Sequence, residues 1–260
     1  MKTGWAENGA PGAGLFSLAA GLLLFPLLAL EAWRVRRRTP RLSEPPGPPA
    51  GLTKGAGIPR RLVVLGESPV AGIGLADHRE GLAARCAAIL NESNGEAVAW
   101  QALGKSGITA REAASELVPG LGSKRVDLLV IALGVNDAIS LHSSGRFRRD
   151  MKSLLAAAVR ETGGSPTIVA GIPPVKYFPA LPQPLRFFLG LRAECLDAVL
   201  PEVVRSFENL RYVPTRFEGG RCLFAPDGFH PGSRGFEVWA ERLAPVMEEM
   251  CGRKAPPGVR

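Results

Sequence analysis

Four short segments of the sequence carry side chains suited to acyl chemistry. In chain order they read Gly66-Glu67-Ser68, Ser106-Gly107-Ile108-Thr109, Gly134-Val135-Asn136-Asp137 and Asp227-Gly228-Phe229-His230. Together they supply a hydroxyl nucleophile, a base with a neighbouring carboxylate, and amide donors for a negatively charged oxygen. These are the groups that nucleophilic acyl transfer by a serine requires.

Ser68, Asp227 and His230 form the candidate catalytic set. Ser68 follows an apolar run, and the glycines and proline around it favour a tight turn that would expose its hydroxyl. The alternative is that Ser68 only caps a helix. His230 is the predicted general base, and Asp227, three residues earlier, can reach its imidazole and orient it. For the other two histidines, His78 and His142, we expect a structural or exposed position.

The candidate oxyanion donors are the backbone N–H groups of Ser68 and Gly107 and the side-chain amide of Asn136. Such donors stabilise the negative oxygen of a tetrahedral intermediate. Asn136 is also a residue that ordinary turns favour, and Gly104 is an alternative to Gly107. Asp137, next to Asn136, is expected to be a structural partner of the site loops and not a catalytic carboxylate.

Strand-length apolar runs alternate with longer helical patterns between residues 60 and 250. The strands are expected at Arg61–Gly66, Ala97–Leu103, Val126–Gly134, Thr167–Ile172 and Leu210–Pro214, and the helices at about 79–91, 109–118, 146–162, 187–207 and 233–250. This order predicts an α/β fold with a parallel sheet between helical layers. Three of the four motifs follow a predicted strand, so they should meet at the carboxyl edge of the sheet.

The four motifs, in this order, resemble those of the SGNH (GDSL-type) hydrolase family over roughly residues 60–250. The resemblance implies a three-layer α/β/α sandwich with a mainly five-stranded, flavodoxin-like parallel sheet. It also implies esterase or lipase activity with the site residues named above. Glu67 departs from the family's Gly-Asp-Ser pattern, although its charge is the same. The chain contains no G-x-S-x-G sequence, which excludes the α/β-hydrolase elbow.

The N-terminal part of the chain differs in character from the rest. Residues 13–30 carry no charge and are long enough, as a helix, to cross a bilayer. We therefore expect a transmembrane anchor with its basic flank at residues 1–38, a Pro/Gly-rich linker at 39–58, the hydrolase domain at 59–252 and a tail at 253–260. The arginines after the apolar run predict a cytoplasmic hydrolase domain. A cleaved signal peptide with an exported domain is the alternative.

Charge and cysteine usage exclude several other classes. The chain has a net charge of +8, but most of the excess lies in the first 60 residues, which is a poor basis for nucleic acid binding. The four cysteines form no C-x-x-C pair and lie at no metal-ligand spacing to histidine, so we expect free thiols and no metal. No organic cofactor is implied.

Residues 173–191 are rich in proline, aromatic residues and leucine and should lie near the active edge. Phe178, Leu181, Phe187 and Phe188 are the candidate acyl-binding residues. The alternatives are a loop that packs its own aromatic rings and a segment that dips into the membrane.

The predicted function is hydrolysis of carboxylic esters of the acyl-lipid, lysophospholipid or thioester type. An acyltransferase or a glycan O-deacetylase could use the same three side chains. A non-catalytic membrane scaffold is a further alternative, but it would not need to keep all of them.

Overall fold

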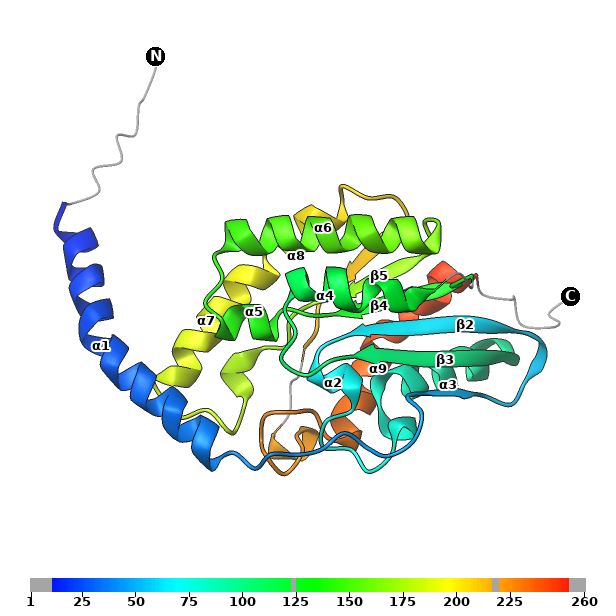
Figure 1. Cartoon of the computed structure of the whole chain (residues 1–260), viewed down its shortest axis with the longest axis horizontal. Helices are drawn as coiled ribbons and strands as arrows, with labels where there is room; N and C mark the ends of the chain where they lie inside the picture. Colours follow the sequence, from blue (N-terminus) through cyan, green and yellow to red (C-terminus); the bar gives the residue numbers. More distant parts are fainter. Residues whose placement is uncertain (1–10, 123–124, 217–219, 253–260) are drawn as a thin grey trace, which may run out of the picture.

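The computed structural model describes residues 11–122, 125–216 and 220–252, with the backbone alone for residues 11–24. The predicted tail at 253–260 and the first ten residues of the predicted anchor segment lie outside the described residues. Within them, a sheet is covered by helices on both faces, and a long N-terminal helix extends along one end of this α/β/α sandwich (Figure 1). The predicted three-layer α/β architecture is present.

The sheet has six strands in the order β1-β3-β2-β4-β5-β6. They are β1 (Ala50–Leu52), β2 (Ala56–Gly66), β3 (Glu96–Gly104), β4 (Leu128–Ala132), β5 (Thr167–Ala170) and β6 (Leu210–Val213). The five predicted strands are β2 to β6, and they pair in parallel. β1 was not expected and pairs antiparallel with β3. It lies in the predicted linker, where three residues are too few to show strand periodicity.

The helices form two layers, one on each face of the sheet. They are α2 (Ser68–Ala71), α3 (Leu82–Asn94), α4 (Ala110–Glu116), α5 (Val135–Ile139), α6 (Ser144–Thr162), α7 (Leu185–Asp197), α8 (Leu200–Val204) and α9 (Ser233–Cys251), with short 3-10 turns η1 (His78–Glu80), η2 (Val118–Leu121), η3 (Val175–Tyr177) and η4 (Arg221–Leu223). Side chains of α4, α6, α7 and α8 share one core cluster, and those of α3 and α9 share the other. Successive residues from Leu62 to Leu65 of β2 therefore alternate between two buried clusters, which explains the apolar run in this half of the strand.

The helix predicted at 187–207 is two helices, α7 and α8. The break falls at residues 198–199, and Pro201 lies in the first turn of α8. Proline is accepted in a first turn because that position needs no N–H donor, but it disrupts a helix interior. The other predicted helices agree with α3, α4, α6 and α9 to within a few residues.

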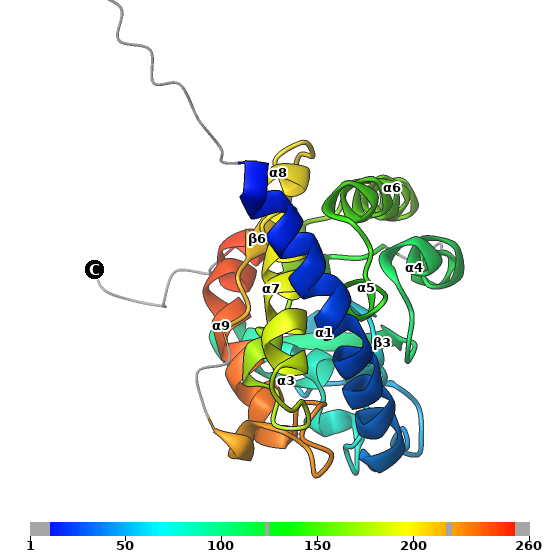
Figure 2. The same ribbon diagram turned by 90° about the vertical axis from the view of Figure 1, so that its left-hand side faces the viewer.

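Helix α1 (Pro11–Arg38) contains the predicted membrane-spanning run and packs beside α7 (Figure 2). Leu28 and Val35 contact the core cluster on that side. Glu31 of α1 accepts a hydrogen bond of 3.1 Å from the backbone N–H of Leu185, the first residue of α7. A carboxylate at this end of a helix satisfies a free donor and complements the helix dipole. Among the described residues, no helix is both long and apolar enough to cross a membrane.

The carboxyl ends of β2 and β3 carry glycines because the backbone is crowded there. A methyl group on Gly104 would lie 2.1 Å from the backbone nitrogen of Ala71, in the turn that follows Ser68. One on Gly66 would lie 2.2 Å from the carbonyl oxygen of Ala132. Neither distance is compatible with a side chain, so these glycines allow the strand ends and the Ser68 turn to pack in direct backbone contact.

Gly104→Ala should therefore lower the free energy of unfolding by about 1–3 kcal/mol or more, the usual range for overpacking. Urea unfolding of the variant and the wild type measures the difference. Gly120→Ala is the matched control, because its added methyl would meet Leu103 at an ordinary 3.6 Å. Equal stability of the two variants would contradict this account of the strand ends.

Candidate active site

Ser68 lies where β2 turns abruptly into the short helix α2. Pro69 occupies the first turn of this helix and Gly72 ends it in the left-handed conformation, at φ +81°. Glu67, with an extended backbone, is the only residue between the end of β2 and the start of α2. The turn holds the Ser68 hydroxyl at the carboxyl edge of the sheet, in one wall of a pocket.

Ser68, His230 and Asp227 are joined by hydrogen bonds. The Ser68 hydroxyl lies 2.9 Å from Nε2 of His230, and Nδ1 of His230 lies 2.6 Å from Oδ2 of Asp227. Oδ1 of Asp227 accepts bonds from the backbone N–H groups of Phe229 and His230, at 2.9 and 3.0 Å. The structure thus brings the three predicted side chains together, with the imidazole of His230 between the Ser68 hydroxyl and the Asp227 carboxylate.

The electrostatics of Asp227 suit the orientation of an imidazole. Burial opposes its ionisation, but the bonds from the His230 ring and from the two backbone N–H groups outweigh burial. The net effect lowers the pKa of Asp227 below its ordinary value. A carboxylate that stays ionised fixes the proton of His230 on Nδ1 and leaves Nε2 free to accept one from Ser68.

Asn136 begins the turn after β4, and its side chain reaches toward the same edge. Its Nδ2 donates a hydrogen bond of 3.0 Å to the carbonyl oxygen of Ile108, in the loop after β3. An amide nitrogen carries two protons, so this bond orients the group and leaves a second donor. Asn136 also lines the pocket together with Ser68.

Glu67 joins the serine turn to the Asn136 turn. Its carboxylate is almost fully buried and accepts hydrogen bonds from the backbone N–H groups of Gly134 and Asn136. Burial raises the pKa of Glu67 to about 8, with a contribution from the nearby Asp137 carboxylate, although the backbone donors oppose the rise. In the sequence, Glu67 stood out only as a charge-conserving departure from the family pattern. The structural role of its carboxyl group was missed.

Asp137 is a structural partner of the site loops, as expected. It is fully buried and accepts bonds from the backbone N–H of Ala110 and from Nδ1 of His142, at 3.0 and 2.8 Å. Burial raises the pKa of Asp137. The carbonyl oxygen of His142 accepts a 2.6 Å bond from Arg192 on α7, which connects these loops to the helix layer.

The same region contains a group of potential metal ligands among the described residues. Ligand atoms of Asp137, His142 and Asp150 lie within 4.8 Å of one another. Asp137 and His142 are hydrogen-bonded to each other, and Asp137 also accepts a hydrogen bond from the backbone N–H of Ala110. These hydrogen bonds account for the cluster as part of the loop framework.

Gly107 lies on the loop after β3 in the left-handed conformation, at φ +79°, and is exposed. It is not among the residues that line the pocket. Gly104, the alternative donor, instead packs its Cα against the backbone of the Ser68 turn. Gly104 is therefore part of the packed strand end, whereas Gly107 lies on the open part of the loop.

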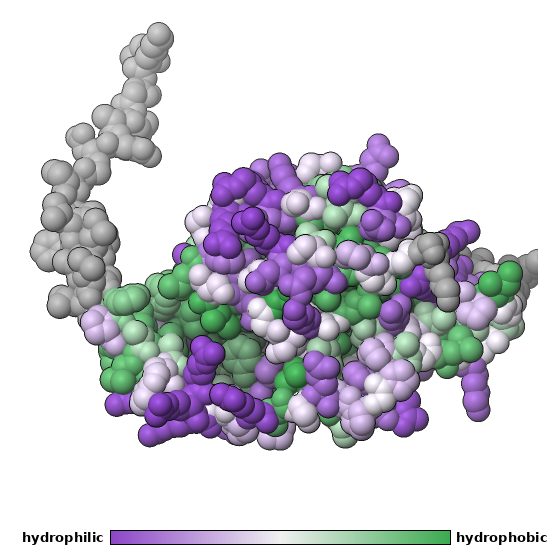
Figure 3. Space-filling view, in the orientation of Figure 1, coloured by the Kyte–Doolittle hydropathy of each residue, from purple (hydrophilic) through white to green (hydrophobic). Residues whose placement is uncertain are grey.

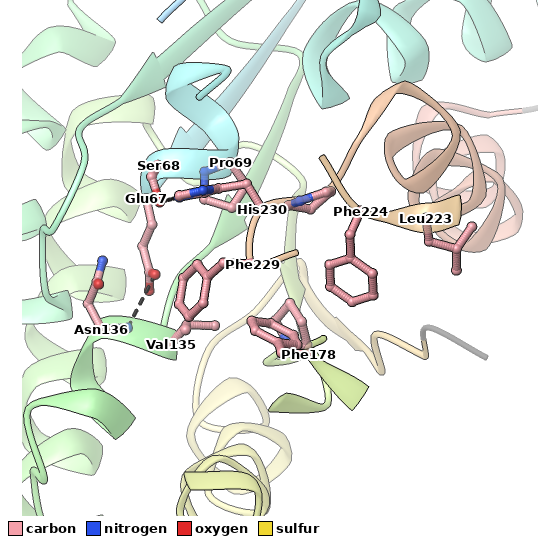
Figure 4. A pocket seen from close by; sticks show the side chains of 12 residues that line it. Glu67, Ser68, Pro69, Val135, Asn136, Phe178, Leu223, Phe224, Phe229 and His230 are labelled. Carbon is pink, nitrogen blue, oxygen red and sulfur yellow. Dashed lines mark hydrogen bonds between the residues drawn. The ribbon is translucent and has the colours of Figure 1, made fainter. Parts of the chain in front are cut away.

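The pocket beside Ser68 is apolar. Its walls include the rings of Phe178, Phe224 and Phe229 (Figure 4). Phe178 meets the other two rings edge to face, with ring centroids 5.4 and 5.2 Å apart. Phe224 and Phe229 were not predicted, although Phe229 lies inside the Asp227–His230 motif and its position there was an available signal.

Three of the four candidate acyl-binding residues do not line this pocket. Leu181 is buried in the core beside it, and Phe187 and Phe188 are exposed on α7. Helix α7 begins at Leu185, close to the start of the helix predicted at about 187–207, and buries Leu185 and Leu189, one helical turn apart. Phe187 falls on the opposite face of the helix and Phe188 at its side, so neither ring points into the core.

Glu67→Gln should change how stability depends on pH. A carboxyl group with a pKa of about 8 in the folded chain and 4.5 as its ordinary value binds a proton more tightly when folded. Its contribution to stability is full below pH 4.5 and is lost as the pH rises through 8.

The free energy of unfolding of the wild type should therefore fall relative to Glu67→Gln between pH 5 and 8, by at most about 1.4 kcal/mol per pH unit. Denaturant unfolding at several pH values measures this. Glu92→Gln, at an exposed position on α3, is the control and should follow the wild type. A wild type that gains stability relative to Glu67→Gln over this range would show that the carboxylate is ionised in the fold.

Comparison with known proteins agrees with this geometry. The model of the GDSL-like lipase/acylhydrolase family matches residues 64–238, which contain all four motifs. No curated protein sequence matches the chain.

Solved structures show the same fold at low sequence identity. A lipase/acylhydrolase from Enterococcus faecalis is 22% identical, with a TM-score of 0.59, and the match covers 76% of this chain and 100% of that one. A protein named TesA is 23% identical, with a TM-score of 0.57, over 74% and 99% of the two chains. A family two carbohydrate esterase from Clostridium thermocellum is 17% identical, with a TM-score of 0.58, over 75% and 66%. With a family model matched over most of its length, this chain belongs to the GDSL-like lipase/acylhydrolase family of esterases and lipases.

Proposed function

We propose that this protein hydrolyses carboxylic esters or thioesters with an apolar acyl group, through an acyl-enzyme on Ser68. The observation that carries the proposal is the hydrogen-bonded series Ser68–His230–Asp227 at the wall of an apolar pocket. Membership of the GDSL-like lipase/acylhydrolase family supports the reaction class.

In the first half of the reaction, the Ser68 hydroxyl attacks the ester carbonyl while Nε2 of His230 accepts its proton. Asp227 stabilises the imidazolium that forms. The negative oxygen of the tetrahedral intermediate receives hydrogen bonds from the N–H groups of Ser68 and Gly107 and from the second Nδ2 proton of Asn136. The imidazolium then protonates the leaving alcohol or thiol, and the acyl group remains on Ser68.

In the second half, a water molecule takes the place of the leaving group. His230 removes its proton, the resulting hydroxide attacks the acyl carbon, and the same donors hold the second oxyanion. Collapse of this intermediate releases the acid and returns the proton to the Ser68 oxygen. The side chains named here are sufficient for this cycle.

The lining of the pocket favours an apolar acyl group. Phe178, Phe224 and Phe229 present ring edges and faces to the space beside Ser68, together with Val135 and Leu223. Such walls gain free energy by removing an alkyl chain from water and offer few hydrogen bonds to a sugar.

Ser68→Ala should lower the turnover of p-nitrophenyl esters at least about a thousandfold, because the nucleophile is lost while substrate binding remains. Turnover by the full-length chain, from acetyl to palmitoyl esters, is the measurement. Ser153→Ala, an exposed serine on α6, should match the wild type. A fluorophosphonate probe should label the wild type and Ser153→Ala but not Ser68→Ala.

Chain-length preference separates this proposal from its nearest alternative. An optimum at medium or long acyl chains is expected from the aromatic pocket. A strong preference for acetyl esters would instead indicate an O-deacetylase, the activity class for which the similar fold of a carbohydrate esterase is a precedent. Loss of probe labelling in folded wild-type protein would overturn the serine mechanism itself.

We further propose that the uncharged run at residues 13–30 tethers the protein to a membrane, with the hydrolase domain in the cytoplasm. The support is the sequence: the run is followed by Arg34, Arg36, Arg37 and Arg38, and basic residues favour the cytoplasmic side.

A C-terminal tag on the full-length chain should accordingly be protected from protease added to intact cells, and should be cleaved after permeabilisation. A tag that is cleaved in intact cells would reverse the proposed orientation. Recovery of a shortened mature protein would favour an exported domain.

A further inference from the structure

A second hollow lies on the other side of the loop that carries Asp227 and His230. It is a groove between the C-terminal half of α1, the loop at residues 179–182, and the segment from Arg221 to Asp227. We call it the arginine groove, because Arg34 and Arg38 of α1 line one wall and Arg221 lies in the other. Arg34 and Arg38 are four residues apart and so share one face of the helix.

The arginine groove carries an excess of positive charge. Two carboxyl groups also line it, and both are engaged: Glu31 accepts the N–H of Leu185, and Asp227 holds His230. No ion pair in the described part of the chain involves Arg34, Arg38 or Arg221. Three guanidinium groups from two distant segments of the sequence therefore line a shared space, and none of the three has an ion-pair partner among the described residues.

The arginine groove and the apolar pocket share their dividing wall. Phe178 lines the pocket and Pro179 the groove, while Phe229 lines the pocket and Asp227 the groove. The two loops of the wall are joined by a 3.0 Å hydrogen bond from the N–H of Ala180 to the carbonyl oxygen of Gly228. A molecule whose acyl group enters the pocket thus has the basic groove a short distance from its ester bond.

The surface view agrees with this arrangement. Hydrophilic side chains gather over the C-terminal end of α1, next to a hollowed and largely hydrophobic part of the surface (Figure 3). A substrate that is apolar at one end and anionic at the other would match both regions.

We propose that the arginine groove binds a phosphate group on the leaving-group side of the substrate. Guanidinium groups are well suited to this role, because they stay charged and bind phosphate oxygens through paired N–H donors. The inference rests on the proposed esterase function and narrows it to acyl compounds that carry a phosphate. Two sources share this chemistry: the headgroup of a lysophospholipid and the nucleotide part of a coenzyme A thioester.

Matched substrates test the groove independently of the esterase activity. Oleoyl-lysophosphatidic acid and monooleoylglycerol share the acyl chain and the ester bond and differ in the phosphate. Palmitoyl-coenzyme A and a palmitoyl thioester of N-acetylcysteamine form the corresponding thioester pair. The full-length wild type should show a higher kcat/KM for the phosphate-bearing member of at least one pair, and that pair identifies the source.

Arg38→Glu and Arg221→Glu should each reduce this phosphate preference about tenfold or more, through KM, with p-nitrophenyl ester turnover unchanged. Arg221→Lys should retain part of the preference. Arg36→Glu is the matched control, because Arg36 lies on the same helix, is exposed, and does not line the groove.

Three outcomes would overturn the proposal. They are the absence of a phosphate preference in either pair, a preference unaffected by Arg38→Glu and Arg221→Glu, and an equal loss in Arg36→Glu. The last would indicate general attraction by the basic segment, as to an anionic membrane surface. Failure of the esterase proposal would appear differently, as loss of p-nitrophenyl ester turnover in the wild type. In that case, calorimetric binding of short-chain hexanoyl-lysophosphatidic acid to Ser68→Ala, with and without Arg38→Glu, still tests the groove.

Discussion

The site depends on one buried carboxyl group, that of Glu67. Glu67 directly precedes Ser68, and its carboxyl group accepts hydrogen bonds from the backbone of the Asn136 turn, which follows the neighbouring strand. Ser68 and Asn136 come from segments almost seventy residues apart in the sequence, and this contact joins their two turns. Because the group is buried, losing its partners would leave uncompensated polar atoms in the interior, which opposes any local loosening of the two turns.

The remaining polar contacts extend this framework outward. Asn136 is hydrogen-bonded to the loop after β3, and Asp137 to Ala110 at the start of α4. The carbonyl oxygen of His142 accepts a hydrogen bond from Arg192 on α7. Asp227 and His230 lie on a separate loop. An isolated bridge between Phe224 and Pro231 closes this loop, which faces the rest of the site across the pocket. The two parts of the site are joined by the hydrogen bond between the Ser68 hydroxyl and Nε2 of His230.

The sequence was most informative where local patterns determine structure. Strands β4 and β5 and the second half of β2 were predictable because strands buried on both faces are apolar throughout, and three of the four motifs were predictable because each follows a strand. The position of His230 follows from its motif and not from the topology, since β6 ends at Val213, well before Asp227. Only long-range contacts bring that loop to Ser68.

What the sequence did not predict depends on tertiary packing. Phe187 and Phe188 seemed suited to a pocket, but the helical period of α7 points neither ring into the core. The role of Glu67 could not be read from its charge, because its partners are backbone groups of a distant turn. The arginine groove could not be anticipated either, because Arg221 meets α1 only in the folded chain.

Strand β1 changes what one edge of the sheet exposes to other molecules. Its three residues pair with Ala99 to Gln101 and so cover the middle of the outer edge of β3, a strand of nine residues. Exposed edges of that length recruit strands from other molecules and promote aggregation. With β1 in place, the sheet ends in short strands on both sides, β1 and β6. The segment between the N-terminal helix and the hydrolase domain therefore protects the sheet from self-association as well as connecting the two.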